Sequence, residues 1–136
     1  MSLNATILDG ATALTPAGGS NITLAPLGIQ NGVAKTFVQN DSTMLTRRTI
    51  DFSVKDPKAN AASPGGMTQA RRKVVLSFPK TVTAGSATVL TQEKITIEAG
   101  FDVGSDAARI KNLLLVAAQT MSDTEFDAFW QAGSLV

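Results

Sequence analysis

Apolar and polar residues alternate along several short segments of the first hundred residues. Residues 46–55 (TRRTIDFSVK) place three apolar side chains on one side and a polar set on the other. Residues 71–80 (RRKVVLSFPK) repeat the alternation, and we expect Pro79 to end that strand because proline cannot donate to the ladder. Residues 92–98 (QEKITIE) alternate again. This period of two predicts antiparallel strands with one dry and one solvated face.

The N-terminal third predicts a hairpin before the main strands. Asp9-Gly10 is a strong two-residue turn signal between strands expected at residues 5–8 and 11–15. The next strand, residues 21–25, is expected to stop at Pro26.

Three loops are expected farther along the chain. Asn31-Gly32 should turn the chain into a strand at residues 33–39, because glycine permits the backbone that such a turn needs. Residues 56–70 form a long loop rich in Pro, Gly, Ala and Ser. Residues 81–91 contain Ala-Gly-Ser at their centre and predict a flexible hairpin tip.

After Gly100 the period changes to that of a helix. Ser105 is the candidate N-cap, with Asp106 in the first turn. A second helix is expected from Ser122, where Glu125 would complete a capping box. The apolar stripes of the two helices consist of Ile110, Leu113, Leu114, Ala117 and Met121, then Phe126, Phe129 and Trp130. Strands followed by helices predict an α+β fold.

Two amphipathic helices can cover only one face of the sheet, so the polar face must meet water or a ligand. The net charge is only +1, but residues 35–94 carry ten Lys and Arg side chains against four Asp and Glu side chains. Residues 95–136 are acidic. A basic middle segment favours a polyanionic partner.

Catalytic and metal-binding signals are missing from the sequence. The 136 residues include no cysteine and no histidine, so the usual thiolate and imidazole ligands are absent and no disulfide can form. No nucleophile elbow, phosphate-binding loop or dinucleotide fingerprint occurs. No apolar run approaches the length of a membrane span. We therefore expect a single domain that is not an enzyme and uses no cofactor, metal, membrane or small-molecule substrate.

Several segments together carry a resemblance. ITLAP (22–26) is followed five residues later by NGVA (31–34), then by RRKVVLSFPK, KITIE (94–98) and two terminal helices. In this order they resemble a coat protein of the small single-stranded RNA bacteriophages, the leviviruses. The resemblance covers most of the chain and is most specific at residues 22–34 and 71–80.

The resemblance implies a fold and an assembly. Residues 1–30 would form an outer hairpin, residues 31–100 a five-stranded antiparallel sheet, and residues 101–136 two dimerising helices, within one domain of residues 1–136. The helices would cross onto the sheet of a second copy and give an interlocked homodimer. Dimers would build an icosahedral virion shell in the cytoplasm of the bacterial host. The helix residues implied at the dimer interface are Ile110, Leu113, Leu114, Phe126, Phe129 and Trp130.

The resemblance also implies that the inner face of the sheet binds genomic RNA. The same face would bind one RNA hairpin, and this binding would repress translation of the replicase. Arg and Lys would hold phosphates, and hydroxyl and amide groups would read unstacked bases. Val75 and Leu90 share this face. The implied RNA-binding residues are Thr49, Asp51, Ser53, Lys55, Arg71, Lys73, Ser77, Gln92, Lys94 and Thr96.

This chain departs from the well-studied members at base-contacting positions. Leu90 replaces an aromatic ring that stacks on a base, and Asp51 and Lys73 replace threonines of an adenine pocket. The cognate hairpin must therefore differ, and general RNA packaging survives these changes better than sequence-specific repression. Two other hypotheses stay open: a non-viral dimeric β-sheet regulator that binds nucleic acid, and a small enzyme or carbohydrate-binding module. The host, the operator and the shell size are not fixed by the sequence.

Overall fold

The computed structural model describes residues 5–41 and 43–134. The chain forms two compact parts. One part, residues 19–103, contains all the strands, and the other combines the N-terminal residues up to Gly18 with the helices that follow Val103.

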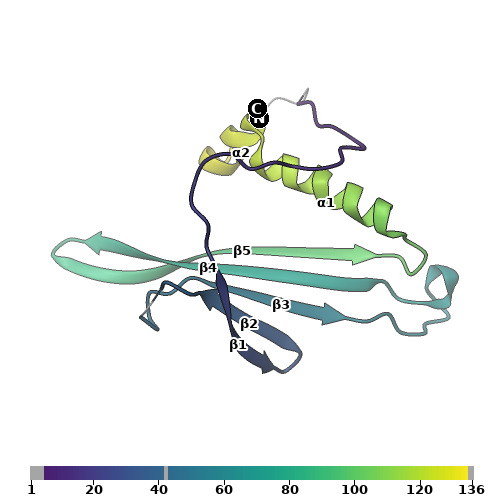
Figure 1. Cartoon of the computed structure of the whole chain (residues 1–136), viewed down its shortest axis with the longest axis horizontal. Helices are drawn as coiled ribbons and strands as arrows, with labels where there is room; N and C mark the ends of the chain where they lie inside the picture. The colour runs from purple at the N-terminus through teal and green to yellow at the C-terminus, as the bar shows by residue number, and fades with distance from the viewer. Residues whose placement is uncertain (1–4, 42, 135–136) are drawn as a thin grey trace. The chain divides into compact units, whose positions relative to one another are not determined.

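The first part is an antiparallel sheet of five strands in sequential order (Figure 1). The strands are β1 (Leu24–Gln30), β2 (Val33–Val38), β3 (Thr49–Lys55), β4 (Ala70–Ala84) and β5 (Ala87–Phe101). Each strand pairs with the next along the chain, and all four pairings are antiparallel. The predicted five-stranded sheet followed by two helices is therefore confirmed.

The sheet begins in a segment that we expected to lie outside it. Pro26 does not end a strand, because β1 continues to Gln30 with a bulge between Pro26 and Gly28. A proline fits here because β1 lies at the edge of the sheet, where an N–H can be missing on the open side without breaking the ladder. Asn31-Gly32 forms the expected turn, with φ of +51° and +76°.

Pro79 does not end its strand either. β4 pairs with β3 only as far as Ser77, so beyond that residue it has no partner on the β3 side. A residue without an N–H is tolerated there, and β4 runs on to Ala84. The predicted flexible tip is instead a regular ladder that closes at Ala84 and Ala87. Figure 1 shows this β4–β5 hairpin extending past the end of β3.

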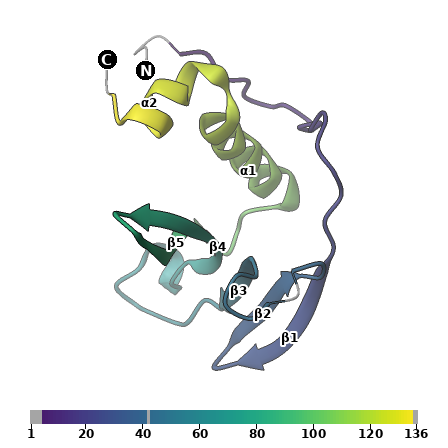
Figure 2. The ribbon, with the colours of Figure 1, turned by 90° about the vertical axis from the view of Figure 1, so that its left-hand side faces the viewer.

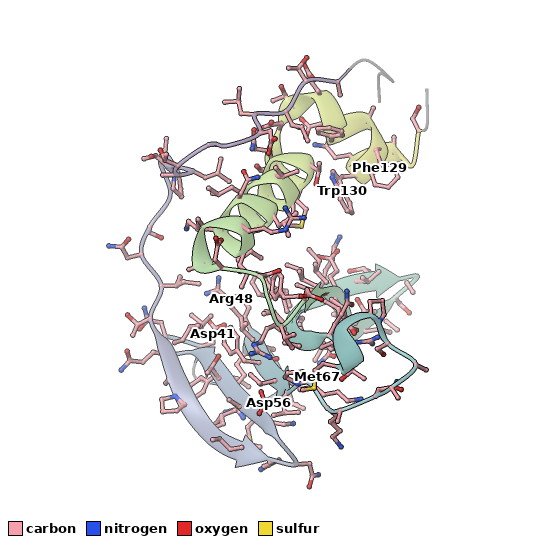
Figure 3. The ribbon with its side chains drawn as sticks, turned by 90° about the vertical axis from the view of Figure 1, so that its right-hand side faces the viewer. Asp41, Arg48, Asp56, Met67, Phe129 and Trp130 are labelled. Atoms are coloured by element: carbon pink, nitrogen blue, oxygen red, sulfur yellow. The ribbon has the colours of Figure 1, made fainter. Side chains whose placement is uncertain are left out.

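The long loop between β3 and β4 has structure of its own. Ala59 and Met67 form an isolated antiparallel bridge. A 3₁₀ turn at Pro64–Gly66 (η1) lies between them. The loop therefore folds back on itself before β4 begins, and Figure 3 labels Asp56 and Met67 near its two ends.

The second part contains helix α1 (Ala107–Ser122), a 3₁₀ turn η2 (Thr124–Phe126) and helix α2 (Asp127–Ala132). Asp106, not Ser105, is the N-cap of α1, since its Oδ1 accepts a hydrogen bond from the Arg109 N–H at 2.8 Å. The second helix begins later than expected, and Glu125 forms no capping box.

Residues 5–18 form no outer hairpin, although Asp9-Gly10 does make a turn. The segment runs beside α1 (Figure 2). The Leu8 N–H donates to Gln119 Oε1 at 2.7 Å, and Gln119 Nε2 donates back to the Leu8 carbonyl at 2.9 Å. The Gly10 N–H donates to Asn112 Oδ1. The backbone groups expected to pair with a second strand are therefore satisfied by side chains of the helix.

Few side chains are fully buried in either part. Among the described residues, Val38 is buried in the sheet, and Leu115 and Gln119 are buried in the helical part. Gln119 is only 4% exposed, and its Nε2 also donates to the Leu115 carbonyl. Leu113 and Leu114 are exposed. A chain of this length can bury a larger core, so much apolar surface is left for contacts with other molecules.

Candidate nucleic-acid interface

The strand register brings the ten sequence-predicted RNA-binding residues onto one face of the sheet. Residues opposite each other in paired strands point to the same face, and so does every second residue along a strand. Asp51, Gln92 and Thr96 therefore share the face set by the following pairs: Thr49–Ser77, Ser53–Lys73, Lys55–Arg71 and Ser77–Lys94. We call these ten residues the basic face.

The opposite side of the sheet is apolar, as the alternation predicted. Val54 is 60% exposed and Ile95 is 58% exposed. A hollow of about 110 Å³ on this side is lined by Leu76, Phe78, Glu93 and Ile95. Arg72, opposite Val54, and Glu93, opposite Phe78, are charged residues on this side. The apolar residues that share this side, which we call the apolar face, are Ile50, Phe52, Val54, Val74, Leu76, Phe78, Ile95 and Ile97.

Most cations of the basic face are available to an external anion. Lys55, Lys73 and Lys94 are exposed, and within the described part of the chain none has a carboxylate within 4.0 Å. Arg71 differs, because its Nη1 lies 3.2 Å from Glu98 Oε1 of the neighbouring strand. A hollow of about 190 Å³ lies among these side chains, lined by Ser53, Val54, Lys55, Arg71, Lys73 and Glu98.

The loop between β2 and β3 is held by a carboxylate–guanidinium pair. Asp41 Oδ2 accepts hydrogen bonds from Arg48 Nε at 2.9 Å and from the Arg48 backbone N–H at 2.8 Å, while Oδ1 accepts from Nη2 at 3.1 Å (Figure 3). The side-chain hydrogen bonds from Arg48, followed by the backbone bond, hold the pKa of Asp41 below its ordinary value. This pair fixes the backbone at Arg47, whose guanidinium lies 4.8 Å from the centre of the Phe37 ring.

Three charged residues outside the predicted RNA-binding set lie beside the basic face. Lys35 lies opposite Asp51, and Glu98 lies opposite Lys73. Arg47 joins Lys35 in lining a pocket with Thr49 and Asp51. The signal for Lys35 was available, since it alternates with apolar Ala34 along the segment 33–39. No comparable pattern marks Arg47, because its place depends on the fold of the loop.

The residues implied at a dimer interface lie in the helical part. Leu113, Leu114, Phe129 and Trp130 are exposed, whereas Ile110 and Phe126 are half-buried. Phe129 and Trp130 make an edge-to-face contact with ring centres 4.9 Å apart (Figure 3). Trp130 Nε1 donates to the Thr120 carbonyl at 2.8 Å, which ties α2 to the end of α1.

Over residues 5–41 and 43–134, no group of three or more acidic side chains is arranged to hold a metal ion. None of the helices described is both long and apolar enough to cross a membrane.

Solved structures match this chain over almost its whole length. The virus-like particle of bacteriophage GQ-907 matches with a TM-score of 0.86 and 25% identity, covering 98% of each chain. That of Beihai levi-like virus 21 matches with a TM-score of 0.69 and 18% identity, over 90% of this chain and 93% of the other. The virus-like particle of bacteriophage AVE019 matches with a TM-score of 0.68 and 12% identity, over 97% of this chain and 98% of the other. No family profile and no curated protein matches the sequence. The structural matches confirm the predicted five-stranded antiparallel sheet followed by two C-terminal helices.

Proposed function

We propose that this levivirus-type coat protein, a capsid subunit rather than an enzyme, packages single-stranded RNA on its basic face. The observation that carries the proposal is the register, which gathers Lys55, Lys73, Lys94 and Arg71 with hydroxyl and amide groups on one side of the sheet. Cations without carboxylate partners attract phosphates, and an RNA that binds them releases its condensed counterions.

We further propose that two copies form a dimer through the edge of the sheet. β5 spans fifteen residues at this edge and has no neighbouring strand on its outer side within the described chain. A long unpaired edge of this kind is a template for another strand. A twofold axis would place the β5 strands of two copies side by side and antiparallel. The basic face would then continue across both copies.

The same dimer would cover the apolar surfaces. The apolar face of the sheet and the exposed helix residues Leu113, Leu114 and Trp130 both need a partner. Helices of one copy laid on the sheet of the other would bury both sets at once. Self-association of this kind agrees with the matches to virus-like particles.

Repression of replicase translation would use the basic face as well. Hydroxyl and amide groups at Thr49, Ser53, Ser77 and Gln92 lie among the cations and can hydrogen-bond to unstacked bases of a hairpin loop. This finer function would depend on the identity of the bases, whereas packaging would depend chiefly on charge.

The test compares the RNA content of purified particles from two double variants. Lys73→Ala with Lys94→Ala removes two cations from the basic face, and Arg109→Ala with Lys111→Ala removes two exposed cations from α1. We expect both to assemble, and only the basic-face variant to lose most of its nuclease-protected RNA relative to protein.

Equal RNA content in the two variants would contradict packaging on the basic face. Electron microscopy of the same samples distinguishes a shell subunit from a non-viral nucleic-acid-binding regulator. A protein that stays a lone dimer and never forms particles would be a nucleic-acid-binding regulator rather than a shell subunit.

A further inference from the structure

A second pocket opens on the side of the sheet that carries the basic face. It lies toward the β1 edge, away from the cations of β4 and β5. Its volume is about 340 Å³. We call it the β1–β3 pocket, and it is lined by Leu27, Gln30, Lys35, Arg47, Thr49 and Asp51.

The polar side chains of the pocket are less exposed than those on the open part of the sheet. Lys35, Arg47, Thr49 and Asp51 are all half-buried, whereas Lys55 and Lys73 on the open part of the sheet are exposed. The Arg47 guanidinium lies over the Phe37 ring, which limits its motion. A hollow lined by half-buried polar side chains, one of them restrained by a ring, suits a flat ligand such as a base.

Asp51 is the distinctive group of the pocket. Within the described residues its carboxylate accepts no hydrogen bond from the protein and has no cation within 4.0 Å. Lys35 and Arg47 line the same pocket and so keep the carboxylate in a positive surrounding. A half-buried carboxylate with free acceptor oxygens fits a ligand that presents hydrogen-bond donors.

We infer that the β1–β3 pocket binds an unstacked guanine and selects it over adenine through Asp51. This inference rests on the proposed RNA packaging and adds a base preference to it. Guanine presents N1–H and the N2 amino group side by side, so both carboxylate oxygens can accept. Adenine presents an acceptor at N1, which the carboxylate repels. Lys35 and Arg47 would hold the flanking phosphates.

The test measures the binding of short RNAs that differ in one base. Full-length protein is freed from its packaged RNA and titrated into fluorescent uridine-rich oligonucleotides with guanine, inosine or adenine at the centre. We expect guanine to bind about tenfold more tightly than adenine, which lies within the usual effect of a bidentate base contact. Inosine keeps N1–H but lacks the 2-amino group, so it should fall between the two.

Matched variants assign the preference to one residue. Asp51→Asn should bring guanine and adenine to within about twofold, because the amide offers only one acceptor. Glu98→Gln removes the same charge from the same side of the sheet but outside the pocket, so its tenfold preference should remain.

Equal affinity for guanine and adenine in the unaltered protein would overturn the inference without any variant. A preference that persists in Asp51→Asn would overturn it too. Failure of all three RNAs to bind would instead contradict RNA binding on the sheet as a whole, so the two proposals fail in different ways.

Discussion

Replacement of Gln119 by leucine tests the unexpected docking of the N-terminal segment on α1. The glutamine amide satisfies both the N–H and the carbonyl of Leu8, at 2.7 Å and 2.9 Å. Leucine has a similar size but can neither donate nor accept a hydrogen bond. In Gln119→Leu, both backbone groups of Leu8 lose their partners.

The expected cost follows from these two contacts. A hydrogen bond contributes about 1 kcal/mol net, so the loss of two destabilises the docked segment by about 2 kcal/mol. The cost falls on local opening of the segment rather than on the whole fold, because β1 to β5 make no part of these bonds. Such a cost raises the population of the undocked segment about 30-fold.

Hydrogen exchange measured by mass spectrometry is the assay. Exchange of the Leu8 amide should accelerate about 30-fold in Gln119→Leu. Asn112→Leu is the control on the same helix. It removes two solvent-exposed hydrogen bonds, one from the Gly10 N–H and one to Asp9 Oδ1, and neither involves Leu8. Exposed bonds contribute less than the part-buried bonds of Leu8, so exchange at Leu8 should change less than about fivefold. A change of less than about threefold at Leu8 in Gln119→Leu would refute the docking argument.

Three further predictions concern the sheet. Lys73→Ala should reduce the magnitude of the slope of log affinity against log salt for a single-stranded RNA by about 0.7. Arg71→Ala should reduce it less, because Arg71 is already paired with Glu98. Equal slopes for the two variants would contradict this prediction. Because Arg48 lowers the pKa of Asp41 below 3.8, the pair stabilises the folded protein fully above that pH, and its contribution is lost as the pH falls through the lowered pKa. Denaturant titrations should therefore show Asp41→Asn less stable at pH 6, with the difference shrinking below pH 3.8. Gly32→Ala should reduce the free energy of unfolding by about 1 kcal/mol, because alanine is strained at a φ of +76°; an unchanged urea midpoint would contradict it.

The alternation in the sequence was enough to predict both faces of the sheet. Neighbouring residues such as Phe52 and Ser53 differ in polarity. A shift of one residue in the strand register would place the apolar side chains on the polar face, so only one register fits the pattern. The register then follows, and with it the common face of Lys73 and Lys94.

The errors arose where local signals depend on distant partners. Pro26 and Pro79 stop a strand only if the missing N–H faces a neighbouring strand, and both lie where the neighbouring side is open. Asp9-Gly10 turns as predicted, but the backbone around it pairs with Gln119, more than a hundred residues away. Nothing near residues 5–15 indicates that partner.

The β1–β3 pocket could not be predicted from the sequence for a similar reason. Its residues come from three strands and one loop, and Arg47 reaches it from the loop in which Arg48 is hydrogen-bonded to Asp41. Asp51 was identified as a residue of the basic face, but its half-buried position among Lys35 and Arg47 depends on the pairing of β2 with β3.

The most direct test of RNA packaging on the basic face is ultraviolet cross-linking of the nucleic acid inside purified particles, with the adducts located by mass spectrometry. We predict adducts on side chains of the basic face, with Lys55, Lys73 and Lys94 among them, and none on Phe52 or Ile95 of the apolar face. Adducts confined to the apolar face or to the helices would contradict the account.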